Sequence, residues 1–587
     1  MYCTILSVTV MGLLALTTLA QDTPQVTFNG AGLSSLKFRG NELLKEGVPG
    51  TVAVTLDKVA LDAQGYRKYT SEKPAVTAPQ STFDAATKTV RQQYSWGKVE
   101  YAYRERPDGL GITVTLVNAG DLNIADFEVP LLVLKLPSAP AALLDKGAMG
   151  SSLDNLITVE APVGEGKLIA CCETMYPPVR FGLGRPASRE SAEFPLLLKG
   201  GVCAAEPGAY SVHPLGLPRV AAGQKLTVEF SLRLAAASVG SDEIIKDLYA
   251  AFRAYYKPRP AWKDNRPIGQ LFLPGGGDGM SETNPRGWFN KKELDVSTAA
   301  GKAQLREMFL KVADQSVKVL KGMDAQGMIL WDVEGDQNPH PITYIGDPRM
   351  IPKLDPEIDG FIDEYFQKFR DAGLKTGVCI RPTQVYYNQE KKAWAHGTGS
   401  DMPGRNEQFQ DLRPKDLPAY QFFPIVERMS DKIAYAQKRW GCTIFYIDTN
   451  GIYQPFGEKG DFPWRLLQAE VWKRLAEKHP DVLLIPELLH GDGTYHTAYW
   501  AYCAQYMELD YGGVWRTPER IKRIFPDAIS CVVMKDAKGY DQKRQDLVEA
   551  VRGGDILLFR GWFDDSINAK VKSVYEDAAK AARPARE

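Results

Sequence analysis

Two acidic residues, Asp448 and Glu487, are the strongest candidates for chemistry in this sequence. Asp448 directly follows the apolar run CTIFYI, and Glu487 directly follows the run DVLLIP. Short apolar runs of this kind are typical of buried β-strands. Each carboxyl group is therefore expected at the end of a strand, where the chain opens onto a polar segment that contains glycine.

The two positions suit a pair of carboxyl groups that act together on one bond. Neighbouring strands of a parallel barrel lie about 4.8 Å apart, so the side chains are expected roughly 5 to 6 Å apart, the separation used by retaining glycosidases. Asp448, followed by polar Thr449 and Asn450, would be the ionised nucleophile. Glu487, in a more apolar setting that disfavours ionisation, would be the acid and base. Taken alone, Asp448 could simply begin a turn, because Asp-Thr-Asn-Gly favours turns.

A second acidic pair, Asp332 and Glu334, follows the run GMILW. Alternate residues of a strand project to the same side, so both side chains would face the same way. Two acids placed like this suit the binding of sugar hydroxyl groups or, together with Asp336, of a divalent cation. Two further interpretations stay open: the two residues could be the catalytic pair themselves, or they could lie at a solvated strand end.

Eight strand-like runs, most of them separated by amphipathic helical segments, follow Pro267. They are IGQLFLP from 268, GMILWDVEG from 327, KTGVCIRP from 375, CTIFYIDTNG from 442, DVLLIPELL from 481, AQYMELDYGG from 504, AISCVVMKD from 528 and DILLFRGWF from 555. Eight β–α units predict a (β/α)₈ TIM barrel, which we place at residues 265–587. A doubly wound open sheet would usually carry a glycine-rich turn leading directly into a helix, whereas PGGGDGMSETNP leads into a long polar loop.

The predicted strand ends gather charged and aromatic residues on one rim, where barrels of this type form their sites. Charged groups make the stronger hydrogen bonds to hydroxyl groups, and aromatic faces stack on sugar rings. The charged substrate-binding candidates are Asp332, Glu334, Arg381 and Asp510. The aromatic candidates are Trp331, Tyr386, Trp515 and Trp562, each of which has packing within the protein as its alternative.

The preceding part of the chain has a different pattern. Residues 21–240 contain short segments such as GITVTLVNAG and KLTVEFSLRL, which alternate apolar with polar residues and predict an antiparallel β-sandwich. Residues 241–264 are predicted to be a helical linker, because SDEIIKDLYAAFRAYY has helical periodicity after a Ser-Asp cap and prolines follow. The predicted fold class is multidomain, a β-sandwich followed by an α/β barrel.

Residues 1–20 are apolar and uncharged and end in Thr-Leu-Ala, which predicts a secretory signal peptide cleaved after Ala20. Its beginning lacks the usual positive charge, so an uncleaved anchor and a misassigned start codon stay open. Cleavage would leave a secreted or periplasmic protein with no other run long enough to span a membrane.

Composition narrows the possible partners. With 71 basic and 72 acidic residues, the chain offers no excess charge for nucleic acid. The 11 Trp and 26 Tyr suit an uncharged sugar ligand. No cofactor or metal is expected, because the cysteines lack CxxC spacing, and Glu487 and His490 have a metal-ligand spacing only on a helix.

The segments FYIDTNG, IPELLHGDGTYH and AQYMELDYGG resemble the catalytic core of the endo-α-N-acetylgalactosaminidases of glycoside hydrolase family 101 and, more broadly, the α-galactosidase-type superfamily. The resemblance covers residues 442–513. It implies a β-sandwich before a (β/α)₈ barrel, with the nucleophile at Asp448 and the acid and base at Glu487. It also implies that His490 and Tyr511 lie beside them as substrate-binding residues.

These observations predict a secreted retaining glycoside hydrolase that cleaves α-linked galactose-type or N-acetylgalactosamine sugars of an oligosaccharide or glycan. One alternative is a carbohydrate-binding protein that has kept the scaffold without catalysis. The other is a glycosidase that depends on a divalent cation bound at Asp332, Glu334 and Asp336. Neither the oligomeric state nor the choice between endo and exo action follows from the sequence.

Overall fold

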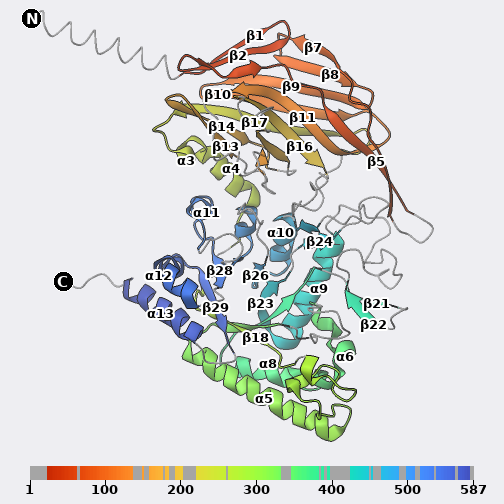
Figure 1. The fold of residues 1–587 in the computed structure, drawn as a ribbon, viewed down its shortest axis with the longest axis vertical. Helices are drawn as coiled ribbons and strands as arrows, with labels where there is room; N and C mark the ends of the chain where they lie inside the picture. Colours follow the sequence, from red (N-terminus) through yellow and green to blue (C-terminus); the bar gives the residue numbers. More distant parts are fainter. Residues whose placement is uncertain are drawn as a thin grey trace, which may run out of the picture. The chain divides into compact units, whose positions relative to one another are not determined.

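Figure 1 shows the computed structural model of the chain, which forms two compact units, one ending at Tyr255 and the other beginning at Tyr256. The structure describes residues 23–61, 67–136, 149–150, 158–175, 179–183, 192–201, 220–259, 262–275, 277–331, 333, 346–382, 385–388, 393–396, 423–448, 451–453, 464–467, 469–487, 497–508, 516–533, 537–561 and 566–581. The predicted signal peptide lies outside these ranges. None of the described helices combines the length and apolar character needed to cross a bilayer.

The first unit is built from two seven-stranded antiparallel sheets. The order in one is β13 (Thr158–Val163), β14 (Gly166–Cys172), β17 (Lys225–Ala236), β10 (Gly109–Asn118), β9 (Gly97–Arg106), β8 (Thr89–Tyr94) and β7 (Gln80–Asp84). The order in the other is β12 (Met149–Gly150), β15 (Arg180–Leu183), β16 (Glu193–Gly201), β11 (Asn123–Lys135), β5 (Ala53–Leu61) and β6 (Arg67–Glu72), and β4 (Leu44–Glu46) pairs with β11. A smaller sheet contains β1 (Gln25–Asn29), β2 (Gly32–Phe38) and β3 (Asn41–Glu42).

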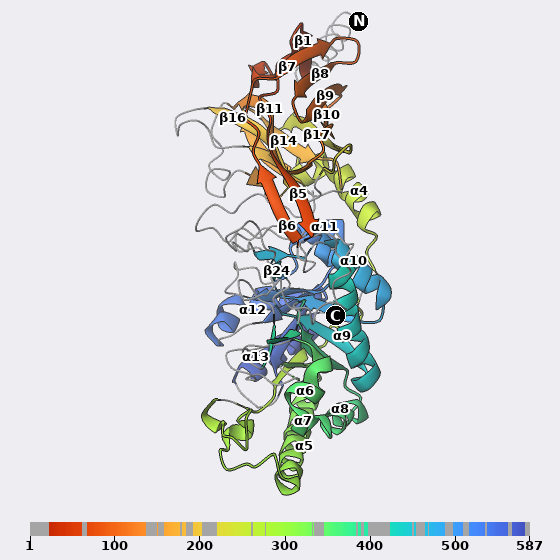
Figure 2. The same ribbon diagram turned by 90° about the vertical axis from the view of Figure 1, so that its right-hand side faces the viewer.

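The two large sheets share one hydrophobic core, as the alternating pattern predicts. Val99 and Tyr101 of β9 are buried in the same core as Phe127 and Val129 of β11. Figure 2 shows the sheets from the side, with β16, β11 and β5 in one layer and β9, β10 and β17 in the other. The predicted β-sandwich is therefore confirmed. Two helices follow it, α3 (Ser241–Ile244) and α4 (Lys246–Tyr256).

The second unit contains eight parallel strands that follow chain order around a barrel. They are β18 (Ile268–Phe272), β19 (Gly327–Trp331), β20 (Thr376–Ile380), β23 (Cys442–Ile447), β26 (Leu483–Pro486), β27 (Gln505–Glu508), β28 (Ser530–Val533) and β29 (Ile556–Arg560). The strand ladder is interrupted between β26 and β27, where the Ala504 amide still donates to the Leu484 carbonyl at 2.9 Å. Each of the eight predicted runs contains one of these strands, which confirms the TIM barrel.

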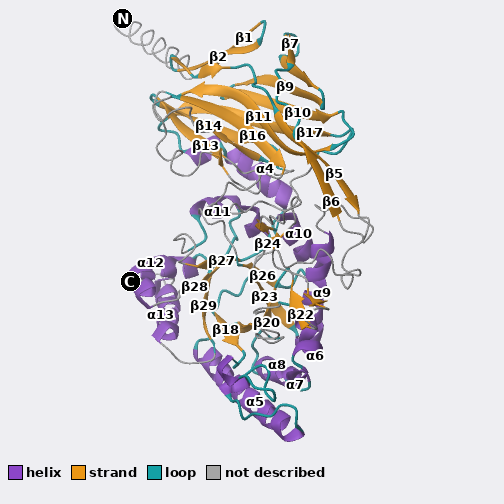
Figure 3. Ribbon diagram, turned by 45° about the vertical axis from the view of Figure 1, so that its right-hand side comes forward, coloured by secondary structure: helices purple, strands orange, loops and turns teal. Residues whose placement is uncertain are grey.

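Helices cover the outside of these strands, as Figure 3 shows in purple around orange. They include α5 (Ala299–Gly322), α6 (Ile351–Leu354), α7 (Pro356–Asp359), α8 (Ile362–Asp371), α9 (Phe423–Trp440), α10 (Ala469–Lys478), α11 (Glu519–Ile524), α12 (Ala537–Arg552) and α13 (Ser566–Ala581). Short 3₁₀ turns lie at Gly277–Gly279, Trp288–Asn290, Pro348–Met350 and Thr497–Ala501, and hairpins pair β21 (Val385–Asn388) with β22 (Ala393–His396) and β24 (Gly451–Tyr453) with β25 (Trp464–Leu466).

The interior of the barrel is filled by alternate residues of its strands. The inward-facing side chains are Ile268, Ile329, Trp331, Cys379, Ile444, Tyr446, Leu483, Ile485, Ala504, Tyr506, Cys531, Val533, Ile556 and Leu558. Because side chains alternate along a strand, a residue two positions after an inward-facing one also faces inward. This rule identifies which residues at the ends of the strands lie over the barrel axis.

Candidate active site

Asp448 and Glu487 occupy equivalent positions at the ends of adjacent strands. Ile447 of β23 pairs in register with Pro486 of β26, so the next residue of each strand is one of the two acids. The Glu487 amide donates to the Ile447 carbonyl at 3.0 Å, and the Asp448 amide donates to the Ile380 carbonyl at 3.0 Å. Parallel pairing therefore continues to both acids, and it places their backbones about 4.8 Å apart.

Both acids also occupy positions at which the side chains of their strands face the barrel interior. Tyr446 faces the barrel interior two residues before Asp448, and Ile485 does so two residues before Glu487. A carboxyl group at each position is therefore directed over the barrel axis rather than toward the surrounding helices. Asp448 is 8 % exposed, and Glu487 is half-buried. The arrangement brings two acids to one point of the C-terminal rim.

Arg381 at the end of β20 contacts the first of these acids. Its Nε and Nη2 atoms both meet Oδ2 of Asp448, and the two side chains are 11 % and 12 % exposed. Cys379, two residues earlier, faces inward, so Arg381 belongs to the same ring of inward-facing positions. A carboxylate that forms an ion pair carries the negative charge a nucleophile needs, and bonds between ionised groups are the strong ones.

The backbone around Arg381 is fixed from both sides. Its amide donates to the Gly346 carbonyl at 3.0 Å, and its carbonyl accepts from Nζ of Lys432 at 2.7 Å. Gly346 has a φ of +65°, and a Cβ atom there would lie 2.5 Å from the Arg381 amide nitrogen. Only glycine allows this close approach, because every other residue carries that atom.

Aromatic rings form a floor beneath the two acids. The ring of Trp331 lies 5.4 Å from that of Phe272 and 4.7 Å from that of Tyr446, and Tyr446 lies 5.2 Å from Tyr506. Burial raises the pKa of Tyr446 well above its usual range, and the carboxyl groups of Glu487 and Asp448, when ionised, act in the same direction. The Tyr446 hydroxyl therefore keeps its proton next to the acids.

The structure places some of the other predicted site residues and not the rest. Trp331 is 7 % exposed and packs in the aromatic floor, and Tyr386 lies on β21. The predicted residues that lie outside the described ranges are Asp332, Glu334, Asp336, His490, Asp510, Tyr511, Trp515 and Trp562. Within the described ranges, no group of three or more His, Cys, Asp and Glu residues could hold a metal ion.

The sequence reasoning missed residues that lie behind Arg381. Lys432 is buried on α9, three residues after buried Met429 and four before buried Ala436, which puts a lysine on the apolar stripe of a helix. A cation on such a stripe is unusual, because lysine is almost never fully buried without a partner. That anomaly was readable in the sequence. For Tyr446 the sequence signal was weaker: it lies two residues before Asp448 and therefore faces the same side of the strand.

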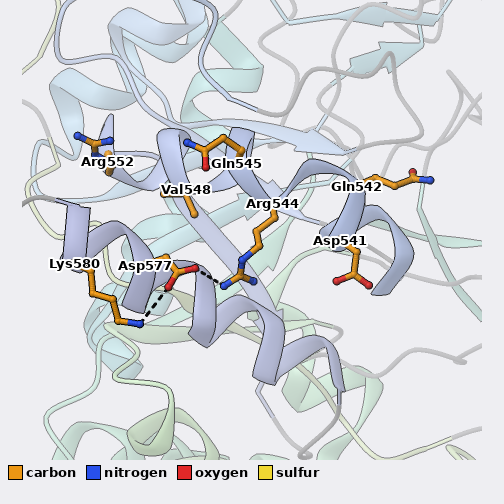
Figure 4. Close-up of a pocket in the computed structure, with 8 residues that line it drawn as sticks. All are labelled: Asp541, Gln542, Arg544, Gln545, Val548, Arg552, Asp577 and Lys580. Atoms are coloured by element: carbon orange, nitrogen blue, oxygen red, sulfur yellow. Dashed lines mark hydrogen bonds and ion pairs between the residues drawn. The ribbon is translucent and has the colours of Figure 1, made fainter.

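A surface depression also exists on the outer layer, between α12 and α13 (Figure 4). Its lining is polar apart from Val548, and consists of Asp541, Gln542, Arg544, Gln545, Val548, Arg552, Asp577 and Lys580. Asp577 pairs with Arg544 at 2.5 Å and with Lys580 at 3.3 Å. None of these residues belongs to the ends of the barrel strands, so the depression is separate from the two acids.

Comparisons with known proteins found similar structures only. No protein-family model matches the chain, and no curated protein matches it. The chain is similar to a GH31 family sulfoquinovosidase from E. rectale, with 11 % identity and a TM-score of 0.45 over 94 % of this chain and 81 % of that one. It is also similar to the α-N-acetylgalactosaminidase NagBb from Bifidobacterium bifidum, with 13 % identity and a TM-score of 0.47 over 95 % and 92 % of the two chains.

Proposed function

We propose that this protein is a retaining glycoside hydrolase with Asp448 as its nucleophile and Glu487 as its acid and base. The observation that carries the proposal is the register of β23 and β26, which extends to both acids through the bond from the Glu487 amide to the Ile447 carbonyl at 3.0 Å. Two inward-facing carboxyl groups on adjacent strands fit the short separation of a retaining pair, which is about 5 to 5.5 Å.

In the first step, protonated Glu487 gives its proton to the glycosidic oxygen while a carboxylate oxygen of Asp448 attacks the anomeric carbon. The bond to the leaving group breaks, and a covalent glycosyl-enzyme forms. In the second step, Glu487, now a carboxylate, takes a proton from water as the water oxygen attacks the anomeric carbon. Asp448 leaves as a carboxylate, and the two inversions give net retention.

Arg381 would select the attacking oxygen. Both of its described contacts with Asp448 fall on Oδ2, so Oδ1 is the oxygen that we assign to the bond with the sugar. The guanidinium group balances the carboxylate charge before attack and again when the carboxylate is released. Preorganised charges of this kind lower barriers because they need no rearrangement during the reaction.

The substrate class comes from the sequence resemblance over residues 442–513. We propose an α-linked galactose-type or N-acetylgalactosamine sugar on a glycan outside the cytoplasm, since the first twenty residues have the pattern of a secretory signal. Of the residues proposed for hydroxyl binding, Arg381 has its guanidinium on Asp448. The substrate-binding roles of Asp332, Glu334, His490, Asp510, Tyr511 and Trp515 remain part of the proposal.

A panel of aryl α-glycosides tests the activity, because the aryl group reports cleavage whatever the natural leaving group is. We expect release from a galactoside or an N-acetylgalactosaminide, with the α-anomer as the first product in the NMR spectrum. A β-anomer as first product would exclude the retaining mechanism. Binding of the same sugars without any release would identify a carbohydrate-binding protein, and loss of release with a chelator would favour the cation-dependent alternative.

A further inference from the structure

The most unusual feature near the acids is a pair of buried cations on one face of α9. Arg428 and Lys432 are 5 % and 0 % exposed, and their spacing of one helical turn puts them side by side. Nε of Arg428 donates to the Pro382 carbonyl at 2.9 Å, and Nζ of Lys432 donates to the Arg381 carbonyl at 2.7 Å. The two cations thus hold two consecutive peptide groups at the end of β20.

A buried carboxylate completes this arrangement. Asp347 is 2 % exposed, and its Oδ2 atom lies 3.8 Å from Nζ of Lys432. Arg349 donates to both carboxylate oxygens of Asp347 at 2.8 Å. Burial tends to raise the pKa of Asp347, but the charges of Lys432 and Arg349 outweigh it and lower this pKa. Asp347 is therefore ionised and balances part of the buried positive charge.

A contribution to the stability of the fold does not explain why residue 432 is a lysine. Burying an ammonium group costs several kcal/mol, and replacing buried ion pairs by apolar residues often leaves a protein equally stable. A peptide carbonyl at a strand end could instead be satisfied by a neutral donor. What the lysine adds is a fixed, charged anchor on the residue whose side chain contacts Asp448.

We propose that Lys432 is a positioning residue, which anchors the backbone of Arg381 so that its guanidinium engages Oδ2 of Asp448 and leaves Oδ1 turned toward the sugar. This inference rests on the proposed function for its catalytic consequence. The path has three contacts: Asp347 to Lys432, Lys432 to the Arg381 carbonyl, and Arg381 to Asp448. The described contact that links Lys432 to the acids is its bond to the Arg381 carbonyl, so we expect its effect to pass through Arg381.

The first test is a crystal structure of Lys432→Met, which keeps the length of the side chain and removes its charge. We expect the contact between the Arg381 guanidinium and Oδ2 of Asp448 to be lost while the barrel is unchanged. A retained contact would overturn the proposal. This readout does not need activity, so it decides the positioning role even if no glycoside is cleaved, an outcome that would count against the proposed function alone.

The second test is a double-mutant cycle on the aryl glycoside that the wild type cleaves. Lys432→Met should lower kcat roughly 10- to 100-fold, in the range of misplaced or unsupported site residues, with KM within about twofold. Added to Arg381→Met, it should cause no further loss, because groups that act through one another are non-additive. If the loss of kcat in the double variant equals the product of the two single losses, Lys432 has a separate structural role and the proposal is contradicted.

Two further variants serve as a substitute and as a control for these tests. If Lys432→Met does not fold, Lys432→Gln keeps a donor without a charge and enters the same structure and cycle. Arg439→Met is the matched control, because Arg439 lies on the same helix and pairs with Asp359 at 2.8 Å and with Asp363 at 2.6 Å, away from Arg381. It should leave kcat unchanged. An equal loss of kcat in this control would show that any disturbance of α9 is sufficient and would overturn the specific role.

Discussion

Arg381 at the end of β20 forms an ion pair with Asp448 at the end of β23, and its Nε and Nη2 atoms both contact the same carboxylate oxygen of Asp448. The neighbouring strand β26 presents Glu487 at the equivalent register position. Three consecutive strands of the barrel thus contribute a cation, a charged acid and a second acid. This order permits one acid to be held as a nucleophile while the other exchanges a proton.

Removing the guanidinium should damage both catalysis and stability. In Arg381→Met, the carboxyl group of Asp448, which is 12 % exposed, loses its ion-pair partner, so we expect a loss of about 3 kcal/mol in the free energy of unfolding. We also expect kcat to fall roughly 100-fold. Urea unfolding and aryl glycoside kinetics measure the two effects. Arg306→Met is the control, because Arg306 and Glu364 are each 48 % exposed; wild-type behaviour in Arg381→Met would remove the assigned role.

Azide should distinguish the two acids by the product that each variant forms. In Glu487→Gln, Asp448 can still attack an activated aryl glycoside, and azide then displaces it from the intermediate, so we expect an α-glycosyl azide. In Asp448→Gly, azide takes the place of the nucleophile and attacks once, so we expect a β-glycosyl azide. NMR of the products reads the anomer directly. The reverse pairing of variant and anomer would exchange the two roles.

Alanine at Gly346 should disturb the site in a way that alanine at Gly373 does not. Both glycines have positive φ, +65° and +74°, so each substitution costs about 1 kcal/mol of backbone strain. Only at Gly346 would the new Cβ meet Arg381, at 2.5 Å from its amide nitrogen, whereas nothing lies within 4 Å at Gly373. We expect kcat to fall at least tenfold in Gly346→Ala alone. Equal kcat in the two variants would contradict the positional argument.

Asp264 should contribute to the acid sensitivity of the fold. Burial tends to raise its pKa, but Arg266 and Lys375 together lower it from the usual 3.8 to about 2. Because the folded pKa is below the unfolded one, its stabilisation is present above about pH 4 and is lost as the pH falls toward about 2.

Asp264→Asn should therefore flatten the dependence of unfolding free energy on pH within this window, as measured by urea unfolding at several pH values. Asp324→Asn is the control, because Asp324 is 86 % exposed and also contacts Arg266, at 3.4 Å. An unchanged pH dependence in Asp264→Asn would show that this carboxyl group titrates alike in the folded and unfolded chains.

The barrel was predictable because most of its strands are buried on both faces and therefore read as apolar runs. CTIFYI and DVLLIP have this pattern, and both become strands that end at an acid. The helical segment between the second and third strand-like runs was less simple, since the structure divides it into separate helices, and α7 ends at Asp359 before α8 begins at Ile362. Gly360 itself keeps helical angles, with φ of −70° and ψ of −15°, and the residue that leaves the helical region is Phe361, with φ of −137°.

The partner of Arg381 was not predictable from the sequence. The end of β20 fixes the position of the Arg381 backbone, but the long side chain can adopt many rotamers. The choice among these rotamers depends on Gly346 and Lys432, which contact the Arg381 backbone from distant segments. The sequence-based prediction assigned Arg381 to substrate hydroxyl groups, whereas the structure places its guanidinium on Asp448. Tertiary contacts of this kind follow from packing rather than from local pattern.

Covalent trapping of the intermediate tests the central claim most directly. A 5-fluoro-α-glycosyl fluoride of the sugar that the enzyme cleaves should form the intermediate faster than water removes it, because fluorine slows both steps and fluoride is a good leaving group. Mass spectrometry of the digested protein should then find the sugar on Asp448. A label on another carboxylate, or turnover of the aryl glycoside with no label on the protein, would contradict the account.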